Sequence, residues 1–221
     1  MRELDLIIFD MDGLMFDTER MAFASWQEAA VRQGYRMDRE TYLKIVGVNI
    51  RKSKEILLTH FGQDFPVDRI RDEGFKITDG IIRLKGVPIK DGLHELLGYL
   101  AKSGIKKAVA TSTSRERALA LLKMAGIETC FDYVLCGDEI ENSKPHPEIF
   151  LKVAAKLGCL PERCLVLEDS EMGILAAYEA GIPSILVPDM KEPSAEIRAL
   201  PLKQMASLHD VRSFLEAASL R

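Results

Sequence analysis

Five short apolar runs constrain the fold of this chain more than any other feature of its sequence. They are rich in Ile, Val and Leu and lie at Leu4–Phe9, Lys107–Ala110, Tyr133–Leu135, Cys164–Leu167 and Ser184–Val187. Runs of this length without polar alternation are typical of parallel strands buried on both faces. Helical patterns alternate with the later runs, and each ends at a glycine that suits a left-handed C-cap: Arg115–Ala125, Pro147–Leu157 and Glu171–Ala180. This alternation predicts an α/β fold with a doubly wound parallel sheet, in which ligands bind at the carboxyl ends of the strands.

About a hundred residues separate the first apolar run from the second, far more than one crossover helix needs. The stretch from Glu19 to Leu84 has helical periodicity and little strand character. Its helix signals are a face shared by Phe23, Trp26 and Ala30, a candidate N-cap at Asp38 for a helix through Val46, and Pro66 in a first turn. We therefore predict a core domain of residues 1–16 and 86–221 with an inserted small helical domain of residues 17–85. Its two connections, at 11–17 and 85–88, can act as a hinge.

The charge balance and the apolar pattern exclude several classes of function. The 221 residues carry a formal net charge of −4, so no overall basic field attracts nucleic acid or an anionic membrane. The apolar runs fall far short of the roughly 18 residues of a membrane span, and the first residues lack the pattern of a secretion signal. The four cysteines form no C-x-x-C pair, which favours buried reduced thiols over a zinc site. We expect a cytoplasmic protein that binds neither nucleic acid nor membranes.

Two aspartates, Asp10 and Asp12, follow the first apolar run directly. The period of a strand places alternate side chains on the same side, and Gly13 allows the backbone to turn away. Two carboxylates this close favour a shared proton or a bound cation. An Asx-type turn that caps the strand end is the alternative interpretation.

A second acidic pair, Glu168 and Asp169, follows the fourth apolar run in the same way. All four carboxylates are then expected to converge at one edge of the sheet, where they repel one another by several kcal/mol at low effective dielectric unless a cation is present. Oxygen ligands suit Mg²⁺. We therefore predict a magnesium site built from these four residues.

Two further segments can bind phosphate. Thr111-Ser112-Thr113-Ser114 follows the second run and precedes a predicted helix, whose N-terminal amides attract anions. Helix capping by a hydroxyl side chain is the alternative there. Lys144 offers a cation in a loop made rigid by two prolines, and a solvated loop lysine is the alternative.

Taken together, these four elements resemble the motifs of the haloacid dehalogenase superfamily, in its branch of small phosphatases and β-phosphoglucomutase-like enzymes. The matching segments are Asp10-Met-Asp12-Gly, Thr111-Ser112, Lys144-Pro and Glu168-Asp169, in the order of the family. The resemblance covers essentially the whole chain. It implies a Rossmann-like core, and the insertion that begins with Phe16-Asp17-Thr18-Glu19 resembles the helical type 1 cap of the family.

The resemblance also implies a role for each motif residue. Asp10 is expected to be the nucleophile that forms an aspartyl phosphate, and Asp12 the general acid and then the general base. Mg²⁺ is expected at the Asp10 carboxylate, the Asp12 carbonyl and Asp169, with Glu168 either a direct or an outer-shell partner. Thr111 and Lys144 are expected to be catalytic as well as phosphate-binding: Lys144 neutralises the phosphoryl oxygens and shields Asp10, and Thr111 donates a hydrogen bond to the phosphate. Ser112 is expected to bind phosphate.

The inserted domain is expected to select the substrate. Arg51, followed by Lys52 and Lys54, is its candidate binding residue, and a solvated helix arginine is the alternative. In the mutase branch a cap histidine occupies the position that matches Ala22, so this chain lacks that imidazole.

The predicted function is a Mg²⁺-dependent phosphomonoesterase acting on a small phosphorylated metabolite, such as a sugar or nucleoside phosphate. A β-phosphoglucomutase-like isomerase is the main alternative, because it shares all four motifs. A receiver-like phosphorylatable signalling domain is a more remote one, and dehalogenases commonly lack the second acid that Asp12 supplies. We expect a monomer or a weak dimer.

Overall fold

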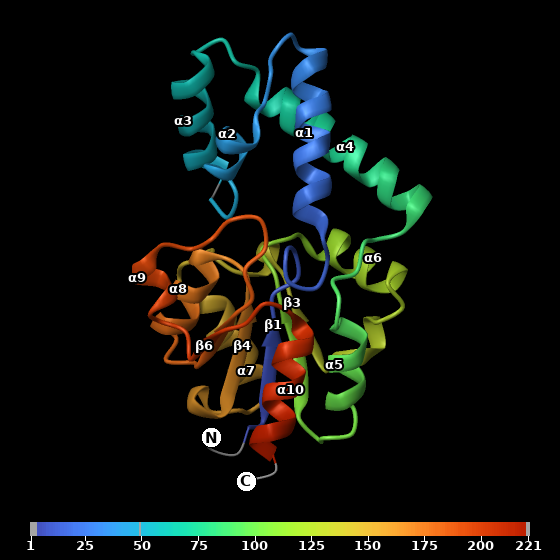
Figure 1. The fold of residues 1–221 in the computed structure, drawn as a ribbon, viewed down its shortest axis with the longest axis vertical. Coiled ribbons are helices and arrows are strands. Elements are labelled where there is room, and N and C mark those ends of the chain that lie inside the picture. Colours follow the sequence, from blue (N-terminus) through green and yellow to red (C-terminus); the bar gives the residue numbers. More distant parts are fainter. Residues whose placement is uncertain (1–3, 49, 220–221) are drawn as a thin grey trace. The chain divides into compact units, whose positions relative to one another are not determined.

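The computed structural model describes residues 4–48 and 50–219 (Figure 1). The chain divides into two units, Met1–Phe16 with Ile89–Arg221 and Asp17–Pro88. The second boundary lies after Pro88, whereas the sequence placed it after Lys85, where helix α4 ends. The Asp17 N–H donates to the Pro88 carbonyl oxygen at 2.8 Å, which holds residues 86–88 beside the start of the inserted unit.

The first unit is built on a six-stranded sheet in the order β3-β2-β1-β4-β5-β6, in which every neighbouring pair is parallel. Its strands are β1 (Leu6–Phe9), β2 (Lys106–Ala110), β3 (Tyr133–Leu135), β4 (Cys164–Glu168), β5 (Ser184–Leu186) and β6 (Lys203–Gln204). The predicted parallel α/β sheet is therefore confirmed. Strand β6 was not predicted, because its two residues are polar and exposed.

Helices cover this sheet. They are α5 (Leu93–Leu100), α6 (Arg115–Met124), α7 (Glu148–Lys156), α8 (Glu171–Glu179), α9 (Ala195–Arg198) and α10 (Leu208–Ser219). Apolar side chains of α7 and α8 pack with Leu6 and Ile8 in one core. Ile7 and Phe9, which alternate with them along β1, are also fully buried, so both faces of the sheet are covered. Helices α5 and α10 lie side by side (Figure 1).

The three helices predicted after the second apolar run form within one or two residues of their expected limits. Gly126, Gly158 and Gly181 follow them with φ angles of 68°, 67° and 67°. These glycines adopt the left-handed conformation that the C-cap prediction required, and the next strand begins shortly after each.

The inserted unit consists of helices, with no strand among its described residues. The helices are α1 (Thr18–Arg32), α2 (Arg39–Leu43), α3 (Ile50–Phe61) and α4 (Val67–Lys85). Helix α1 packs along α4, and Ala30, with Phe23 and Trp26 against it, belongs to the apolar core of this unit. Asp38 caps α2 by accepting a hydrogen bond from the Thr41 N–H at 2.7 Å, as predicted. The helix ends at Leu43, earlier than expected. None of the described helices is both long and apolar enough to cross a membrane.

Candidate active site

The carboxyl ends of three neighbouring strands meet at Lys144. Its ammonium Nζ donates to Asp10 Oδ1 at 2.6 Å, to Glu168 Oε1 at 2.7 Å and to the Ala110 carbonyl oxygen at 3.1 Å. Asp10 follows β1, and its own N–H is fixed by the Leu167 carbonyl of β4. The Lys144 side chain is only 5% exposed. Lys144 is therefore a buried part of this site, not the solvated loop lysine of the alternative interpretation.

Glu168, the last residue of β4, holds Lys144 from the opposite side. It is completely buried, and its Oε2 accepts hydrogen bonds from the Asp169 N–H, the Ser170 N–H and the Ser170 hydroxyl at 3.0, 2.9 and 2.9 Å. A Cβ at Gly173 would lie 1.8 Å from Glu168 Cδ, so a glycine is required where α8 passes this carboxylate. Both Glu168 oxygens accept hydrogen bonds from protein groups, and these bonds fix the position of the carboxylate without a ligand.

Burial and charge act against each other at this cluster. Burial raises the pKa of Asp10, the Lys144 ammonium lowers it, and the carboxylates of Glu168 and Asp12 raise it again, so the pKa stays above its ordinary value. For Lys144, burial lowers the pKa, but the charges of Asp10 and Glu168 outweigh this and raise it. Lys144 therefore remains protonated at neutral pH. One ammonium does not neutralise the carboxylates around it, and the site favours a further cation.

Carboxylate oxygens of Asp10, Glu168 and Asp169 lie within 4.8 Å of one another, in a set that can ligate a metal ion. Gly13 makes room for this set: its φ is +90°, and a Cβ there would lie 2.2 Å from Asp169 Oδ2. Hard oxygen donors with excess negative charge fit Mg²⁺. The sequence predicted four converging carboxylates, whereas only three form this set. The Asp12 carboxylate turns instead to a hydroxyl on another loop.

That hydroxyl belongs to Thr113, which donates to Asp12 Oδ2 at 2.8 Å. Thr113 lies in the segment predicted to bind phosphate, but no individual role was predicted for it. The sequence signal was weak, since Thr113 is the third of four successive hydroxyl residues and nothing local distinguishes it from its neighbours. The contact joins residues 101 positions apart in the chain.

The loop after β2 presents the predicted phosphate-binding residues. Thr111 is buried and its Oγ accepts the Thr113 N–H at 3.1 Å, while Ser112 is exposed. Ser114 occupies the N-cap of α6 without a side-chain capping bond. The Arg115 N–H is bound instead by Asp138 Oδ1 at 2.9 Å. Capping by a hydroxyl side chain is therefore not what Ser114 does.

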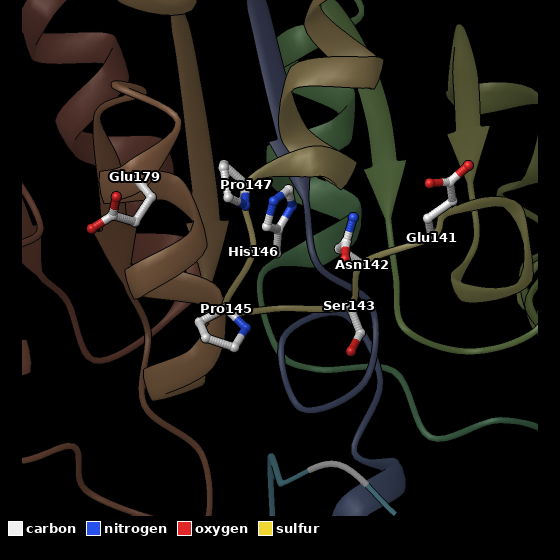
Figure 2. A pocket seen from close by; sticks show the side chains of 7 residues that line it. All are labelled: Glu141, Asn142, Ser143, Pro145, His146, Pro147 and Glu179. Carbon is white, nitrogen blue, oxygen red and sulfur yellow. The ribbon is translucent and has the colours of Figure 1, made fainter.

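The loop that carries Lys144 is anchored at its ends by Glu148. The Glu148 carboxylate accepts from the N–H groups of Glu141 and Asn142, each at 2.9 Å, and pairs with Lys152 at 2.6 Å. Lys152 and these amides hold the pKa of Glu148 low, at about 2. A hollow of about 530 Å³ on this loop is lined by residues 141–143, 145–147 and Glu179. Figure 2 shows the side chains of these residues. Lys144 is not part of its lining, so the hollow is separate from the carboxylate cluster.

The inserted unit has a pocket of its own, of about 240 Å³, whose lining includes Ala22, Trp26 and Tyr42. The Tyr42 hydroxyl donates to Glu19 Oε2 at 3.3 Å within it. Arg51 is exposed in the first turn of α3 and does not line this pocket. Its substrate role stays a prediction, and Asn49 lies outside the described residues.

Lys52 and Lys54, which follow Arg51, pair with acidic side chains on the surface of the inserted unit. Lys52 Nζ lies 3.2 Å from Glu55 Oε2, and Lys54 Nζ lies 2.6 Å from Asp68 Oδ2. Both bridges are solvent-exposed. These contacts are those of ordinary surface lysines.

Comparison with known proteins assigns this arrangement to a family. Residues 7–187 match the model of the haloacid dehalogenase-like hydrolases. The chain belongs to this family. Among its relatives in the family, the phosphorylated carbohydrates phosphatase of Thermotoga maritima is 34% identical over 82% of this chain and 84% of its own. The fructose-1-phosphate phosphatase of Escherichia coli is 27% identical over 81% of this chain and 94% of its own.

Solved structures of the family share the fold. A haloacid dehalogenase family hydrolase from Deinococcus radiodurans, crystallised with phosphate and sodium, superposes with a TM-score of 0.82 at 26% identity, over 100% of this chain and 98% of its own. The family, the fold and the assignment as a phosphatase, all predicted from the sequence, are thus confirmed.

Proposed function

We propose that this phosphatase hydrolyses a small phosphate ester, such as a sugar or nucleoside phosphate, through an aspartyl phosphate on Asp10 in the presence of Mg²⁺. The observation that carries the proposal is the position of Lys144 Nζ, between Asp10 Oδ1 and Glu168 Oε1. A buried ammonium beside a strand-end carboxylate lowers the repulsion between that carboxylate and an incoming phosphoryl group. Alignment and charge neutralisation are what phosphoryl transfer mainly requires.

In the first half-reaction, an Asp10 carboxylate oxygen attacks phosphorus and the bond from phosphorus to the ester oxygen breaks. Asp12 donates a proton to the departing oxygen, so the alcohol leaves neutral. In the second, Asp12 removes a proton from water as the water oxygen attacks the phosphoryl group, and the bond from phosphorus to Asp10 breaks. Inorganic phosphate is released, and both carboxyl groups return to their initial protonation states.

Residues of the core unit are proposed to stabilise the negative charge that develops on the phosphoryl oxygens. Lys144 stays positively charged throughout, and Thr111 with Ser112 offers hydroxyl and amide donors ahead of helix α6. Mg²⁺ would be held by the carboxylates of Asp10 and Asp169 and the carbonyl of Asp12, and when bound it withdraws negative charge from the phosphoryl group. Both Glu168 oxygens are already engaged, which favours its role as an outer-shell partner.

Two relatives support a sugar phosphate as the substrate class, since they are named for phosphorylated carbohydrates and for fructose 1-phosphate. Arg51 and the pocket of the inserted unit are the proposed determinants of selection. The free cysteines, none of them in a disulfide among the described residues, support a reducing compartment such as the cytoplasm.

A screen of phosphate monoesters for inorganic phosphate release, with Mg²⁺ present, tests the proposal. We expect turnover of one or more sugar or nucleoside phosphates. No release from any ester would overturn it.

The isomerase alternative has its own test. Incubation with β-glucose 1-phosphate, Mg²⁺ and a trace of glucose 1,6-bisphosphate should release phosphate without isomerisation, because Ala22 offers no imidazole in α1. Rapid formation of glucose 6-phosphate with little free phosphate would instead establish a mutase.

A further inference from the structure

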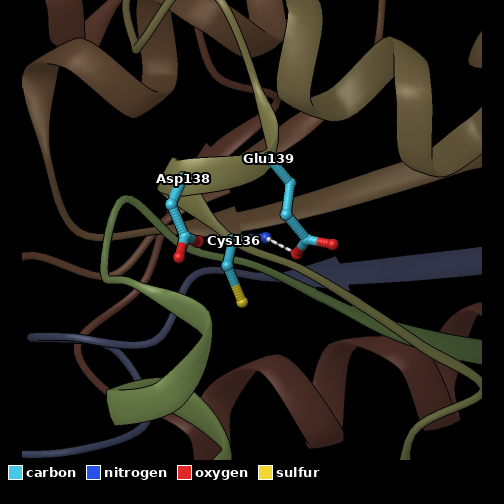
Figure 3. Close-up of side chains that lie close together, drawn as sticks. All are labelled: Cys136, Asp138 and Glu139. Atoms are coloured by element: carbon cyan, nitrogen blue, oxygen red, sulfur yellow. Dashed lines mark hydrogen bonds between the residues drawn. The ribbon is translucent and has the colours of Figure 1, made fainter.

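A turn that none of the proposed chemistry uses packs directly beneath the phosphate-binding loop. It consists of Cys136 and the short 3-10 helix Gly137–Glu139, which follow β3. Cys136, Asp138 and Glu139 lie close together, with ligand atoms within 4.8 Å of one another (Figure 3). Side chains of these types can ligate a metal ion. Whether they do so depends on whether their ligand atoms are already bound to other groups of the protein.

The potential ligands of this turn are bound to protein groups. Asp138 Oδ1 accepts the Arg115 N–H at 2.9 Å. Glu139 Oε2 accepts the Cys136 N–H at 3.0 Å, drawn as a dashed line in Figure 3, and lies 3.1 Å from the Arg115 guanidinium. Burial, followed by the Glu139 charge, raises the pKa of the Cys136 thiol to about 12, so the thiol stays protonated. The turn is a structural element whose acceptors face helix α6 and the loop before it.

At Gly137 the backbones of the turn and of the loop after β2 are in direct contact. The Gly137 N–H donates to the Thr113 carbonyl oxygen at 3.0 Å. A Cβ at Gly137 would lie 2.2 Å from the Ser112 carbonyl oxygen and 2.7 Å from the Ser112 carbonyl carbon. Gly137 does not have a positive φ, so its backbone conformation is open to any residue. Only the lack of space against the Ser112 backbone requires a glycine.

Thr113 connects the turn to the proposed acid and base. Its carbonyl is fixed by Gly137, its N–H by Thr111 Oγ at 3.1 Å, and its hydroxyl donates to Asp12 Oδ2 at 2.8 Å. With the backbone held on both sides, the hydroxyl has a defined position, and so does the carboxylate that it binds. A displacement of the loop would therefore move Asp12.

We propose that the turn Cys136–Glu139 is a positioning element of the active site: through Thr113 it sets the place of the Asp12 carboxyl group for proton transfer. Gly137 and Thr113 are positioning residues in this scheme, and Asp12 is the catalytic group through which they act. The inference rests on the proposed function, in which Asp12 protonates the leaving oxygen.

The test uses leaving groups that differ in their need for a proton. The nitrophenolate of p-nitrophenyl phosphate leaves without protonation, whereas the alkoxide of a sugar phosphate does not. For the sugar phosphate that the wild type hydrolyses fastest, Gly137→Ala and Thr113→Val should lower kcat/KM by about 10²-fold, the effect of a displacement of about 1 Å. For p-nitrophenyl phosphate the loss should stay below about 10-fold. Thr113→Ser keeps the hydroxyl and should restore the sugar phosphate activity.

Two controls isolate the mechanism. Gly98→Ala, in helix α5 of the same unit, places a Cβ in open space and should leave both activities unchanged. The double variant Gly137→Ala/Thr113→Val should lose little more than either single variant, because both act through the same contact. Additive losses, or equal losses on both substrates, would overturn the proposal. If Gly137→Ala melts far below the wild type, its activities are not interpreted. The proposal is then tested by Thr113→Val and Thr113→Ser, and it is overturned if Thr113→Val shows no selective loss on the sugar phosphate or if Thr113→Ser does not restore that activity.

Asp12→Ala separates failure of the inference from failure of the proposed function. If Asp12→Ala shows the selective loss on the sugar phosphate while Gly137→Ala and Thr113→Val do not, the turn is not a positioning element although Asp12 is the acid. If Asp12→Ala retains full activity on both substrates, the acid-base assignment itself is wrong.

Discussion

Replacement of Lys144 by methionine should destabilise the protein as well as inactivate it. The substitution keeps the volume and flexibility of the side chain and removes only its charge and donors. Lys144 is 5% exposed and lies 2.6 and 2.7 Å from carboxylates whose side chains are 11% and 0% exposed. In Lys144→Met, Asp10 and Glu168 would face each other in a buried site without their counter-charge.

The size of the effect follows from that burial. Removal of one partner from a buried ion pair costs about 3–5 kcal/mol, because the remaining charge is neither solvated nor compensated. For a protein of this length, 1 kcal/mol corresponds to about 2–4 °C in melting temperature. We therefore expect Lys144→Met to melt about 6–20 °C below the wild type, with phosphate release reduced to background.

The measurement is thermal unfolding followed by circular dichroism, with EDTA present so that no added cation compensates for the lost ammonium. Lys152→Met is the matched control. Its ammonium also lies 2.6 Å from a carboxylate, that of Glu148, but the lysine side chain is 47% exposed. Solvent screens a pair this exposed, so the melting temperature of Lys152→Met should fall far less than that of Lys144→Met.

A second substitution in the same site gives the result that can refute the reasoning. Asp10→Asn in the Lys144→Met background removes one of the two uncompensated carboxylates, so the double variant should melt above Lys144→Met alone. Added Mg²⁺ should also raise the melting temperature of Lys144→Met. If the double variant is the less stable of the two, or if Lys144→Met and Lys152→Met melt alike, buried charge is not what Lys144 compensates.

The remaining predictions concern catalysis and pH. Asp10→Asn should abolish phosphate release in the monoester assay while its circular dichroism spectrum stays that of the wild type, and retained turnover would remove Asp10 as nucleophile. Asp12→Ala should lower kcat on a sugar phosphate by at least about 10²-fold; a wild-type rate would contradict its acid-base role. EDTA should stop the reaction and Mg²⁺ restore it, so full activity of protein shown to be metal-free would exclude the proposed site. The pKa of Glu148 is lowered from 4.5 to about 2. The stability that its carboxylate contributes to the folded protein is therefore fully present above pH 4.5 and is lost as the pH falls toward 2. The gap in melting temperature between wild type and Glu148→Ala should narrow over that range, and a constant gap would contradict this.

The parts of the site that the sequence predicted best are those fixed by backbone geometry. Asp10 and Glu168 each sit at the end of a buried strand, and parallel strands bring such ends to one edge of the sheet. The glycines after α6, α7 and α8 likewise have one conformational role, which a sequence shows directly. For these residues the conformation that the local sequence favours is also the one that the fold requires.

The side-chain directions were less predictable, because they depend on partners far away in the chain. Asp12 has the spacing to join the other carboxylates, yet it binds Thr113 across 101 positions. Ser114 has the chemistry of a helix cap, yet Asp138 from another loop binds the Arg115 N–H. In both cases tertiary packing, which brings distant segments together, determines which of two chemically acceptable partners is bound.

The start and end of the inserted unit meet in space. Asp17 and Pro88 share a hydrogen bond of 2.8 Å, and on the core side Phe16 pairs with Ile89 as an antiparallel bridge. The insertion is therefore a closed loop in the chain, and a loop of this kind adds an entropic cost that grows only slowly with its length. A different helical unit with adjacent ends, or a short turn, can join the same two points without altering the strands. The residues proposed for chemistry all lie outside the insertion, so substrate choice can evolve by exchange of one module while the reaction is inherited unchanged.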